Sequence, residues 1–317
     1  MFNEAKICVI IPAYNAAQSI TEVIDTLPEW VDQIIAVNDC SKDDTLEVLR
    51  NMSEPRLKVI SHEKNQGVGG AMKTGSAESV SGDADIFVKI DSDGQMDPNQ
   101  LHRLLNPIIN KEANYTKGNR FLQTKQLKAM PPLRRLGNYV MSFFSKIATG
   151  FWNIFDPTNG FTAISRQALE LIDLSQLDNG YYFETSLLEA LYLVRVPIKD
   201  VSMHAIYKGE KSYLSESKVL VQFPIKMIAT FFNRIHLTYF MQDFNAVSIF
   251  LVVGSISLLF GFIWGVVQWR IASLANTPAS TGTVMIAVLP IFLGIQLLLE
   301  ALVLDTQNTP RDFIAKE

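Results

Sequence analysis

The segment 86–95, IFVKIDSDGQ, joins a short apolar run to a group of oxygen-bearing side chains. The run is typical of a buried strand, and Asp91, Asp93 and Gln95 follow it directly. Two carboxylates separated by a single residue can direct hard oxygen ligands at one divalent cation. Mg²⁺ or Mn²⁺ is usually bound in this way, by one or two carboxylates together with substrate phosphates. An isolated Asp-x-Asp pair also occurs in ordinary turns, so its meaning depends on the fold around it.

Strand and helix patterns alternate around this segment, over the first 120 residues. We predict strands at 6–13, 33–38, 57–61, 86–90 and 115–118, and helices near 19–27, 43–52, 68–80 and 98–109. This alternation predicts an α/β fold with a mostly parallel sheet and helices on its faces. In such folds the ligand binds beyond the carboxyl ends of the strands.

Other unusual residues end the neighbouring predicted strands. Pro12, Ala13, Tyr14 and Asn15 end the first, and Asp39 follows the second. Because the carboxyl ends of parallel strands meet at one edge of a sheet, we expect all of these residues to lie near the Asp-x-Asp pair. If the segment 91–95 were only a turn, it would not need two carboxylates at an edge of the sheet that already carries Asp39. The position of the pair therefore favours a metal site over a simple turn.

Basic residues are concentrated between positions 103 and 155, although the chain as a whole has a net charge of −4. Nine of them stand against the single acid Glu112: Arg103, Lys111, Lys117, Arg120, Lys125, Lys128, Arg134, Arg135 and Lys146. A solvated basic face and a surface for phosphates or anionic lipid head groups both fit this pattern. Nucleic acid is not among the partners that we predict.

Two segments near the C-terminus are long and apolar enough to span a membrane. Residues 246–267 hold no charge, and a helix of this length measures about 33 Å, against about 30 Å for a hydrocarbon core. Residues 283–299 form a second uncharged run. Basic residues lie before the first segment and after the second, so the positive-inside rule predicts a cytoplasmic N-terminal domain and C-terminus. These residues are Lys208, Lys211, Lys218, Lys226 and Arg234 before, and Arg311 and Lys316 after.

The stretch 213–244 mixes apolar and basic residues and predicts one or two amphipathic helices in the membrane interface, broken or kinked at Pro224. We predict a loop over 268–282 between the two membrane segments. Small residues in those segments, Gly254, Gly261 and Gly265, would allow packing between two copies of the chain, so a homo-oligomer is a possible partner arrangement.

Seven motifs in order resemble the family 2 glycosyltransferases with a GT-A fold, a Rossmann-like sheet. Four lie in the N-terminal part: 12–15 (PAYN), 38–41 (NDCS), 65–71 (NQGVGGA) and 91–95 (DSDGQ). Three more are similar to the dolichyl-phosphate-mannose-synthase branch: 118–121 (GNRF), 156–161 (DPTNGF) and 182–185 (YFET). The resemblance covers about residues 6–305, including the two C-terminal membrane segments.

The resemblance implies roles for individual residues. The donor site would comprise Pro12, Ala13, Tyr14, Asn15, Asp39, Gly67 and Asp91, with Asp39 on the nucleotide base. Asp91, Asp93 and Gln95 would hold the metal, and Asp93, Arg120 and Asp156 would be catalytic. Phosphate and acceptor contacts would come from Arg120, Arg134, Arg135, Lys208 and Lys211.

Some of these roles stay open at the level of sequence. The sequence does not favour Arg134 over Arg135 as the residue that contacts phosphate. Asp156 has three interpretations: a carboxylate that orients another group, a general base, or part of a simple Asp-Pro-Thr turn. Relatives carry an arginine where this chain has Ile206, so Lys208 or Lys211 would have to supply that charge. The donor is accordingly a UDP-sugar or a GDP-sugar.

The implied function is metal-dependent, inverting transfer of a sugar from a nucleotide-sugar to a polyprenyl phosphate, with undecaprenyl phosphate expected, at the cytoplasmic face of a bacterial inner membrane. The product would be a lipid-linked monosaccharide for cell-envelope glycans. A phosphate monoester has a second pKa of about 6 and is already nucleophilic, so the enzyme can work mainly by positioning and electrostatics, and whether it uses a general base stays open. A processive polysaccharide synthase and a non-catalytic nucleotide-sugar-binding assembly subunit are the alternatives.

The domain organisation follows from these expectations. Residues 1–212 would form the catalytic domain, divided into a nucleotide-sugar half (1–95) and an acceptor half (96–212). Residues 213–244 would be interfacial helices, 245–305 two transmembrane helices, and 306–317 a cytoplasmic tail.

Overall fold

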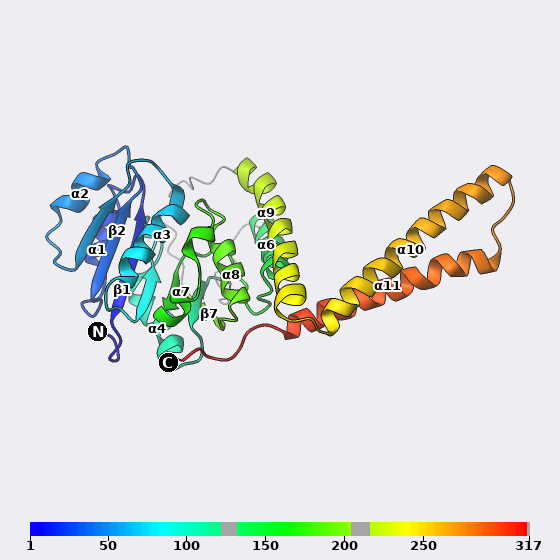
Figure 1. Cartoon of the computed structure of the whole chain (residues 1–317). Helices are drawn as coiled ribbons and strands as arrows, with labels where there is room; N and C mark the ends of the chain where they lie inside the picture. Colours follow the sequence, from blue (N-terminus) through cyan, green and yellow to red (C-terminus); the bar gives the residue numbers. More distant parts are fainter. Residues whose placement is uncertain (122–131, 204–215, 316–317) are drawn as a thin grey trace. The chain divides into compact units, whose positions relative to one another are not determined.

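The computed structural model describes residues 1–121, 132–203 and 216–315 (Figure 1). The chain divides into two compact units. The first comprises Met1–Phe231 together with Pro310–Glu317, and the second comprises Phe232–Thr309.

The first unit is built on a seven-stranded sheet with the order β3-β2-β1-β4-β6-β5-β7. Its strands are β1 (Ile7–Ala13), β2 (Gln33–Asn38), β3 (Leu57–Ser61), β4 (Ile86–Lys89), β5 (Tyr115–Asn119), β6 (Thr162–Ser165) and β7 (Ile198–Ser202). β6 runs antiparallel to both of its neighbours, while the remaining strand pairs are parallel. The predicted mostly parallel α/β fold is confirmed, as are the five predicted strands to within one residue.

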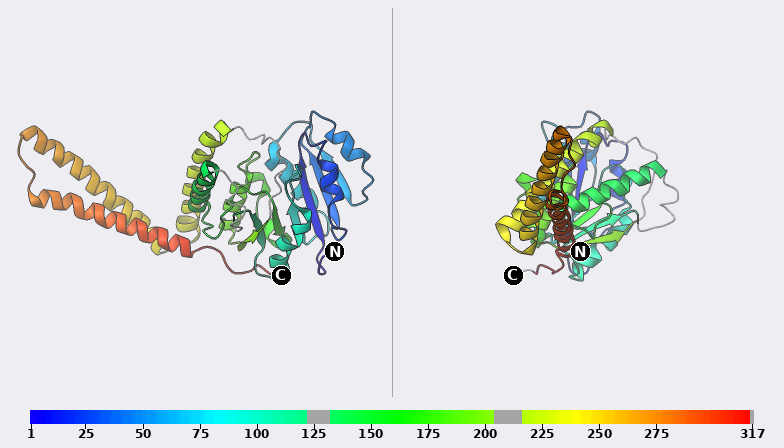
Figure 2. Two further views of the ribbon diagram at one scale, coloured as in Figure 1. Left: turned by 180° about the vertical axis from the view of Figure 1, so that it is seen from behind. Right: turned by 90° about the vertical axis from the view of Figure 1, so that its right-hand side faces the viewer.

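Helices cover both faces of the sheet (Figures 1 and 2). They are α1 (Ile20–Asp25), α2 (Thr45–Asn51), α3 (Gly67–Val80), α4 (Leu101–Ile109), α7 (Arg166–Glu170) and α8 (Phe183–Leu193), and a further helix, α6 (Pro132–Thr149), packs against α8. A hydrophobic core lies on each face of the sheet, and alternate residues of β1 point into one core or the other. Ile7, Val9 and Ile11 belong to the core that includes α1 and α4, whereas Cys8 and Ile10 belong to the core that includes α3 and α8. Burial on both faces explains why β1 is a continuous apolar run rather than an alternating one.

Helix α6 has no counterpart among the predicted helices. It exposes a row of large apolar side chains: Leu136, Tyr139, Val140, Phe143 and Phe144. Its other face is packed through Met141 and Ala148 against Tyr182 and against Phe223 and Met227 of α9 (Glu216–His236). Pro224 lies inside α9, and the helix continues past it to His236. Of the break or kink that we predicted at this proline, the break is therefore wrong.

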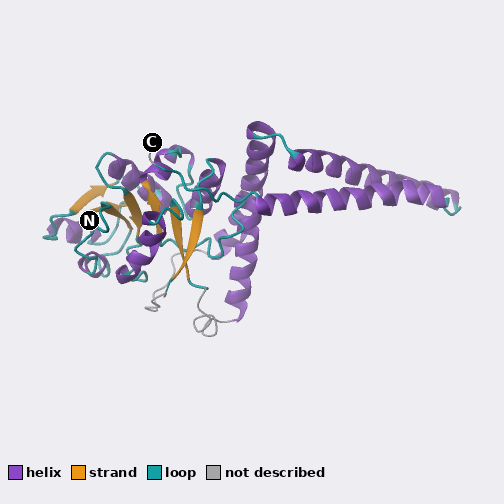
Figure 3. Cartoon of the chain, turned by 90° about the horizontal axis from the view of Figure 1, so that it is seen from below, coloured by secondary structure: helices purple, strands orange, loops and turns teal. Residues whose placement is uncertain are grey.

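The second unit is a hairpin of two long helices, α10 (Ala246–Ala275) and α11 (Thr281–Gln307), preceded by a π-helical turn, η3 (Leu237–Gln242) (Figure 3). Both helices are long and apolar enough to cross a membrane, and their most apolar 18-residue windows have mean hydropathies of 2.5 and 2.3. Only 22% and 11% of their most apolar windows are buried, so they are not core helices of a globular domain. The predicted loop begins later than expected, because α10 continues to Ala275.

Close packing between α10 and α11 depends on glycine. A Cβ on Gly261 would lie 2.6 Å from the carbonyl oxygen of Ala287, and one on Gly254 would lie 3.2 Å from that of Gly294. These two glycines therefore serve contacts within one chain, which removes them as an argument for packing between copies.

An ion pair closes the base of the second unit. Arg234, which is fully buried, places Nη1 and Nη2 at 2.6 and 3.1 Å from the two carboxylate oxygens of Asp305. The hydroxyl of Tyr239 donates to the same carboxylate at 2.7 Å. The beginning of this unit is thus joined to the end of α11.

The residues after α11 belong to the first unit. Ile314 donates its backbone N–H to Asn114 Oδ1 (2.8 Å), and Asn114 Nδ2 donates to the Ile314 carbonyl (2.9 Å). Asn114 is completely buried, and the Ile314 side chain packs on the core beneath α8.

Candidate active site

The carboxyl ends of β1, β2, β4 and β5 meet at one edge of the sheet. Because β6 runs in the opposite direction, the residues that precede it, 156–161, reach the same edge. At the end of β1, Asn15 adopts a left-handed conformation with φ of 51°. Its side chain accepts from the backbone N–H of Lys42 (2.8 Å), and its own N–H donates to Ser41 Oγ (3.0 Å), which ties β1 to the loop after β2.

Asp39 lies at this edge but is buried. Its carboxylate accepts from the backbone N–H groups of Gln66 (2.8 Å) and Gly67 (2.7 Å), and His62 Nδ1 lies 2.7 Å away. These contacts hold the loop that begins α3. The predicted contact of Asp39 with a nucleotide base stays a prediction, and it would have to share a carboxylate that protein groups already bind.

The glycines at the start of α3 have a structural reason of their own. Gly67 has a φ of +83°, and a Cβ there would lie 2.5 Å from the carbonyl oxygen of Asn179. Gly70 donates its N–H to the same carbonyl at 3.1 Å. The glycines thus allow close approach to the loop before α8, and the predicted donor contact of Gly67 is not tested by this geometry.

Asp91 has one oxygen bound to the protein. Its Oδ1 lies 3.2 Å from Lys89 Nζ, and Lys89 also forms a short ion pair with Glu184. Burial would lower the pKa of Lys89, but the negative charges of Asp91 and Glu184 raise it above its usual value. Lys89 is therefore charged, and Asp91, whose side chain is about one-third exposed at 32%, is held by a buried cation.

The residues predicted to hold a metal suit a hard divalent cation. Asp93 Oδ1 accepts from the N–H of Gln95 at 3.0 Å, which folds the segment back after Asp91. A Cβ on Gly160 would lie 2.7 Å from Asp91 Oδ2, so the glycine leaves space beside that oxygen. Within the described ranges no group of three or more His, Cys, Asp or Glu could hold a metal, so phosphate oxygens of a substrate would have to complete the ligand set.

Two exposed tyrosines lie near this carboxylate. Partial burial, followed by the charge of Asp91 and the proximity of Tyr14, raises the pKa of Tyr181. Tyr14 and Tyr181 are 38% and 54% exposed, so part of each ring is accessible to solvent.

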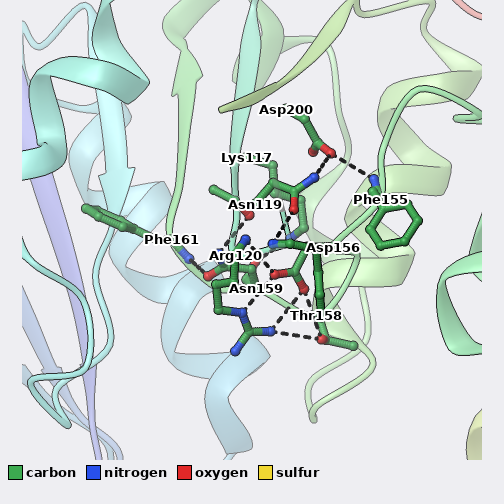
Figure 4. A network of polar contacts seen from close by, with 11 residues as sticks. Lys117, Asn119, Arg120, Phe155, Asp156, Thr158, Asn159, Phe161 and Asp200 are labelled. Atoms are coloured by element: carbon green, nitrogen blue, oxygen red, sulfur yellow. Dashed lines mark hydrogen bonds and ion pairs between the residues drawn. The ribbon is translucent and has the colours of Figure 1, made fainter. Parts of the chain in front are cut away.

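Arg120 and Asp156 form a bidentate pair (Figure 4). Arg120 Nε lies 2.8 Å from Asp156 Oδ2, and Nη2 lies 3.0 Å from Oδ1. The Asp156 side chain is 1% exposed whereas that of Arg120 is 30% exposed. Such a fork fixes the plane of a guanidinium, so Asp156 orients Arg120 toward the sheet edge.

A buried lysine and amide anchor the segment beside this pair (Figure 4). Lys117 Nζ donates to the Asn159 carbonyl, and burial lowers the pKa of Lys117 to about 8. Asn159 Nδ2 donates to the Gly118 carbonyl (2.7 Å), and Asn159 Oδ1 accepts from Phe161 N–H (3.0 Å). Gly118 N–H in turn donates to the Phe161 carbonyl at 2.8 Å.

Asp200 on β7 joins the two chain segments that carry the ion pair. Its Oδ2 accepts from Asn119 Nδ2 (2.6 Å) and from the N–H of Phe155 (2.8 Å), the residues directly before Arg120 and Asp156 (Figure 4). Burial raises the pKa of Asp200 to about 6.

Four predicted phosphate-binding residues are not placed. Arg134 and Arg135 lie on α6, but their side chains are outside the described residues. Lys208 and Lys211 lie outside the described ranges altogether.

Sequence reasoning gave no role to Lys89, Glu184, Asn159 or Asp200, although Asn159 and Glu184 lie in the motifs 156–161 and 182–185. One signal was available: Lys89 is the single charge in an apolar strand that is buried on both faces, and a buried lysine requires a partner. Its partner, Glu184, is 95 residues away and could not be identified without the fold.

A mostly parallel sheet with an Asp-x-Asp pair at its carboxyl edge defines a transferase domain of the GT-A type. Residues 8–172 match the family model described as "Glycosyl transferase family 2", and the chain belongs to this family.

Two of its relatives are named for transfer to a lipid phosphate. The chain is 33% identical over 237 residues, 69% of its length and 92% of the relative's, to UDP-N-acetylglucosamine–dolichyl-phosphate N-acetylglucosaminyltransferase of Methanococcus voltae. It is 28% identical over 187 residues to undecaprenyl-phosphate mannosyltransferase of Micrococcus luteus, covering 57% of this chain and 76% of that one.

Among solved structures, glucosyl-3-phosphoglycerate synthase of Mycobacterium tuberculosis, in complex with Mn²⁺, UDP and glucosyl-3-phosphoglycerate, shares the fold. Its TM-score is 0.53 at 21% identity, and the match covers 73% of this chain and 80% of that chain. The GT-A fold that the sequence implied is confirmed.

Proposed function

We propose that this glycosyltransferase moves a sugar from a UDP- or GDP-sugar to a polyprenyl phosphate at a membrane surface, with inversion at the anomeric carbon. The names of its relatives support this acceptor class. Undecaprenyl phosphate is the acceptor that we would test first. The product is a lipid-linked monosaccharide for assembly or modification of cell-envelope glycans.

The state of Asp156 carries the proposal. A hydroxyl acceptor needs a carboxylate that is accessible and able to take a proton. Both oxygens of Asp156 accept hydrogens from Arg120, and the side chain is almost fully buried. This arrangement suits an acceptor that is already an anion, because the oriented guanidinium can then bind a phosphate without any proton transfer.

The chain's own residues would therefore act by position and charge. Arg120 would hold the acceptor phosphate close to the donor, against the repulsion between two anions. Asp91, Asp93 and Gln95 would bind Mg²⁺ or Mn²⁺, which supplies positive charge for the leaving nucleoside diphosphate. The exposed faces of Tyr14 and Tyr181 would cover the donor beside Asp91.

The membrane features support a lipid acceptor. Helices α10 and α11 are suited to cross a bilayer, and the chain after α11 returns to the first unit through the contact between Ile314 and Asn114. Two crossings with both ends on one side fit the positive-inside prediction of a cytoplasmic catalytic domain. The exposed apolar row on α6 supports contact of the first unit with the membrane surface.

The decisive experiment measures transfer of radiolabelled sugar from a panel of UDP- and GDP-sugars to undecaprenyl phosphate. Purified wild type and Asp93→Ala are compared with Mg²⁺, with Mn²⁺ and with a chelator. We expect label in the organic phase for one donor, lost in the variant and with the chelator. No lipid-linked product from any donor would refute the proposal and favour a nucleotide-sugar-binding assembly subunit, and a polymeric product would favour a processive synthase.

The role of Asp156 is tested separately with Asp156→Asn. If Asp156 orients Arg120, the KM for polyprenyl phosphate rises about tenfold with a smaller change in kcat. If it is a general base, kcat falls at least about a hundredfold. Thr158→Val is the matched control, because Thr158 Oγ1 makes only long contacts of 3.5 Å with Arg120 Nη2 and Asp156 Oδ1, so its loss leaves the bidentate pair in place.

A further inference from the structure

The most unusual charge in the first unit is Lys89, a buried cation in the middle of the sheet. Its side chain is 6% exposed, and its two carboxylate partners are Asp91 and Glu184. These three groups sum to one net negative charge. A buried charge persists only when it is paired, so the Lys89–Glu184 pair is a fixed feature behind the sheet edge.

The two oxygens of Asp91 have different surroundings. Oδ1 is held by Lys89 at 3.2 Å. Oδ2 faces Gly160, where an added Cβ would lie 2.7 Å from it and 2.6 Å from Lys89 Nζ. The absent side chain of Gly160 is thus what leaves room for both the carboxylate and its lysine partner.

The backbone at Gly160 is held on both sides and cannot easily yield. Lys117 donates to the carbonyl of Asn159, while the Asn159 side chain binds Gly118 and Phe161. A methyl group at position 160 would therefore displace the ends of the Lys89 and Asp91 side chains rather than the backbone.

We propose that Lys89, Glu184 and Gly160 are positioning residues for Asp91 in the donor site. The Lys89–Glu184 pair fixes one carboxylate oxygen, and Gly160 keeps the other accessible to a divalent cation. This inference rests on the metal-assisted donor binding proposed above and adds the residues that prepare Asp91 for it.

A neutral pair of substitutions isolates the positioning effect. Replacing Lys89 alone would leave Glu184 as an uncompensated buried charge, which is strongly destabilising. The double variant Lys89→Met/Glu184→Gln removes one positive and one negative charge together, so the net charge near Asp91 is unchanged. What it removes is the anchor of Oδ1.

The experiment measures Mn²⁺ binding to the full-length protein in detergent by electron paramagnetic resonance of free Mn²⁺, in the presence of UDP. The variants are Gly160→Ala, the double variant and Asp91→Asn, with Gly82→Ala as the control. A Cβ on Gly82 would meet atoms no closer than 3.4 Å, and this residue lies beyond the C-terminal end of α3. Circular dichroism and thermal unfolding check that each variant is folded.

We expect Mn²⁺ affinity to fall about 10- to 100-fold in Gly160→Ala and in the double variant, the range typical of residues that orient metal ligands. The Mn²⁺ concentration that half-activates transfer should rise in parallel, while kcat at saturating Mn²⁺ recovers. A purely structural role would not produce that recovery.

Two outcomes would overturn the inference, and they are distinguishable. If wild type binds Mn²⁺, Asp91→Asn does not, and both test variants bind like Gly82→Ala, only the positioning role is refuted. If wild type itself binds no Mn²⁺ with UDP, the proposed metal site fails and the positioning role fails with it.

Discussion

Replacing Asp200 by asparagine removes one buried charge and preserves the shape of the side chain. Burial raises the pKa of Asp200 from 3.8 to about 6. The folded protein thus holds a proton that the unfolded chain releases. The stabilisation from that proton is complete below pH 3.8 and is lost as pH rises to about 6 and beyond.

The size of the effect follows from the shift. A change of about two pKa units corresponds to about 3 kcal/mol of unfolding free energy in total, of which about 2 kcal/mol, or about 4–8 °C in Tm for a domain of this size, falls above pH 4.5. The charged groups that face Asp200 are Asp156, Lys117 and Lys146.

The assay compares thermal unfolding of wild type and Asp200→Asn in detergent from pH 4.5 to 8. The Tm of the variant should rise relative to the Tm of wild type as the pH increases to about 6.5. Above that pH the difference between the two Tm values should stay constant. A constant decrease in the Tm of the variant is expected as well. Asp200 Oδ1 has no hydrogen-bond partner among the described residues, so an amide N–H group placed there would find no acceptor.

Asp173→Asn is the control. Asp173 is exposed, and the hydrogen bond from Ser175 lowers its pKa, so its gap to wild type should be flat over the same range. The reasoning would be refuted if the difference in Tm between Asp200→Asn and wild type did not change with pH, or if the variant lost Tm relative to wild type as the pH rises.

Three further outcomes are expected. Arg234→Met should destabilise the second unit by about 3–5 kcal/mol in thermal unfolding, because it leaves the charge of Asp305 buried without its cation, and a second change, Asp305→Leu, should restore most of the loss; no recovery would contradict this. Under native conditions at pH 8 a maleimide should label Cys40 and spare Cys8, since burial raises the pKa of the Cys8 thiol to about 12; mass spectrometry showing two labels would refute it. Gly69→Ala should lower stability by about 1–3 kcal/mol, because its methyl would overlap a backbone carbonyl of the loop before α8, and an unchanged Tm would disprove this contact.

The sheet could be predicted from the sequence because its central strands are buried on both faces and therefore appear as short apolar runs between turns. Helix α6 could not, because its apolar residues face outward in this unit and its basic residues suggested only a charged surface. The break predicted at Pro224 was wrong because α9 accommodates the proline within the helix.

The site, like the fold, has residues that could be predicted from the sequence and residues that could not. Motifs placed Asp91, Asp93, Arg120 and Asp156 at one edge, and the structure brings their segments there. Their supporting partners could not be predicted, because each pairing joins residues that only the tertiary fold brings together. Glu184 reaches Lys89 from α8, and the segment around Gly160 reaches Asp91 because β6 runs antiparallel.

The contact between Asn114 and Ile314 sets an order for biosynthesis. A ribosome makes the sheet first and the tail last, with the hydrophobic hairpin between them, yet the Asn114 amide lies in a fully buried position that the tail completes. Until the segment around Ile314 has been made, this amide lacks two of its three hydrogen bonds and keeps only the one that Nδ2 donates to Ser165 Oγ (3.1 Å), a deficit of about 1–3 kcal/mol. The first unit therefore reaches its full stability only in chains that extend through the hairpin as far as Ile314.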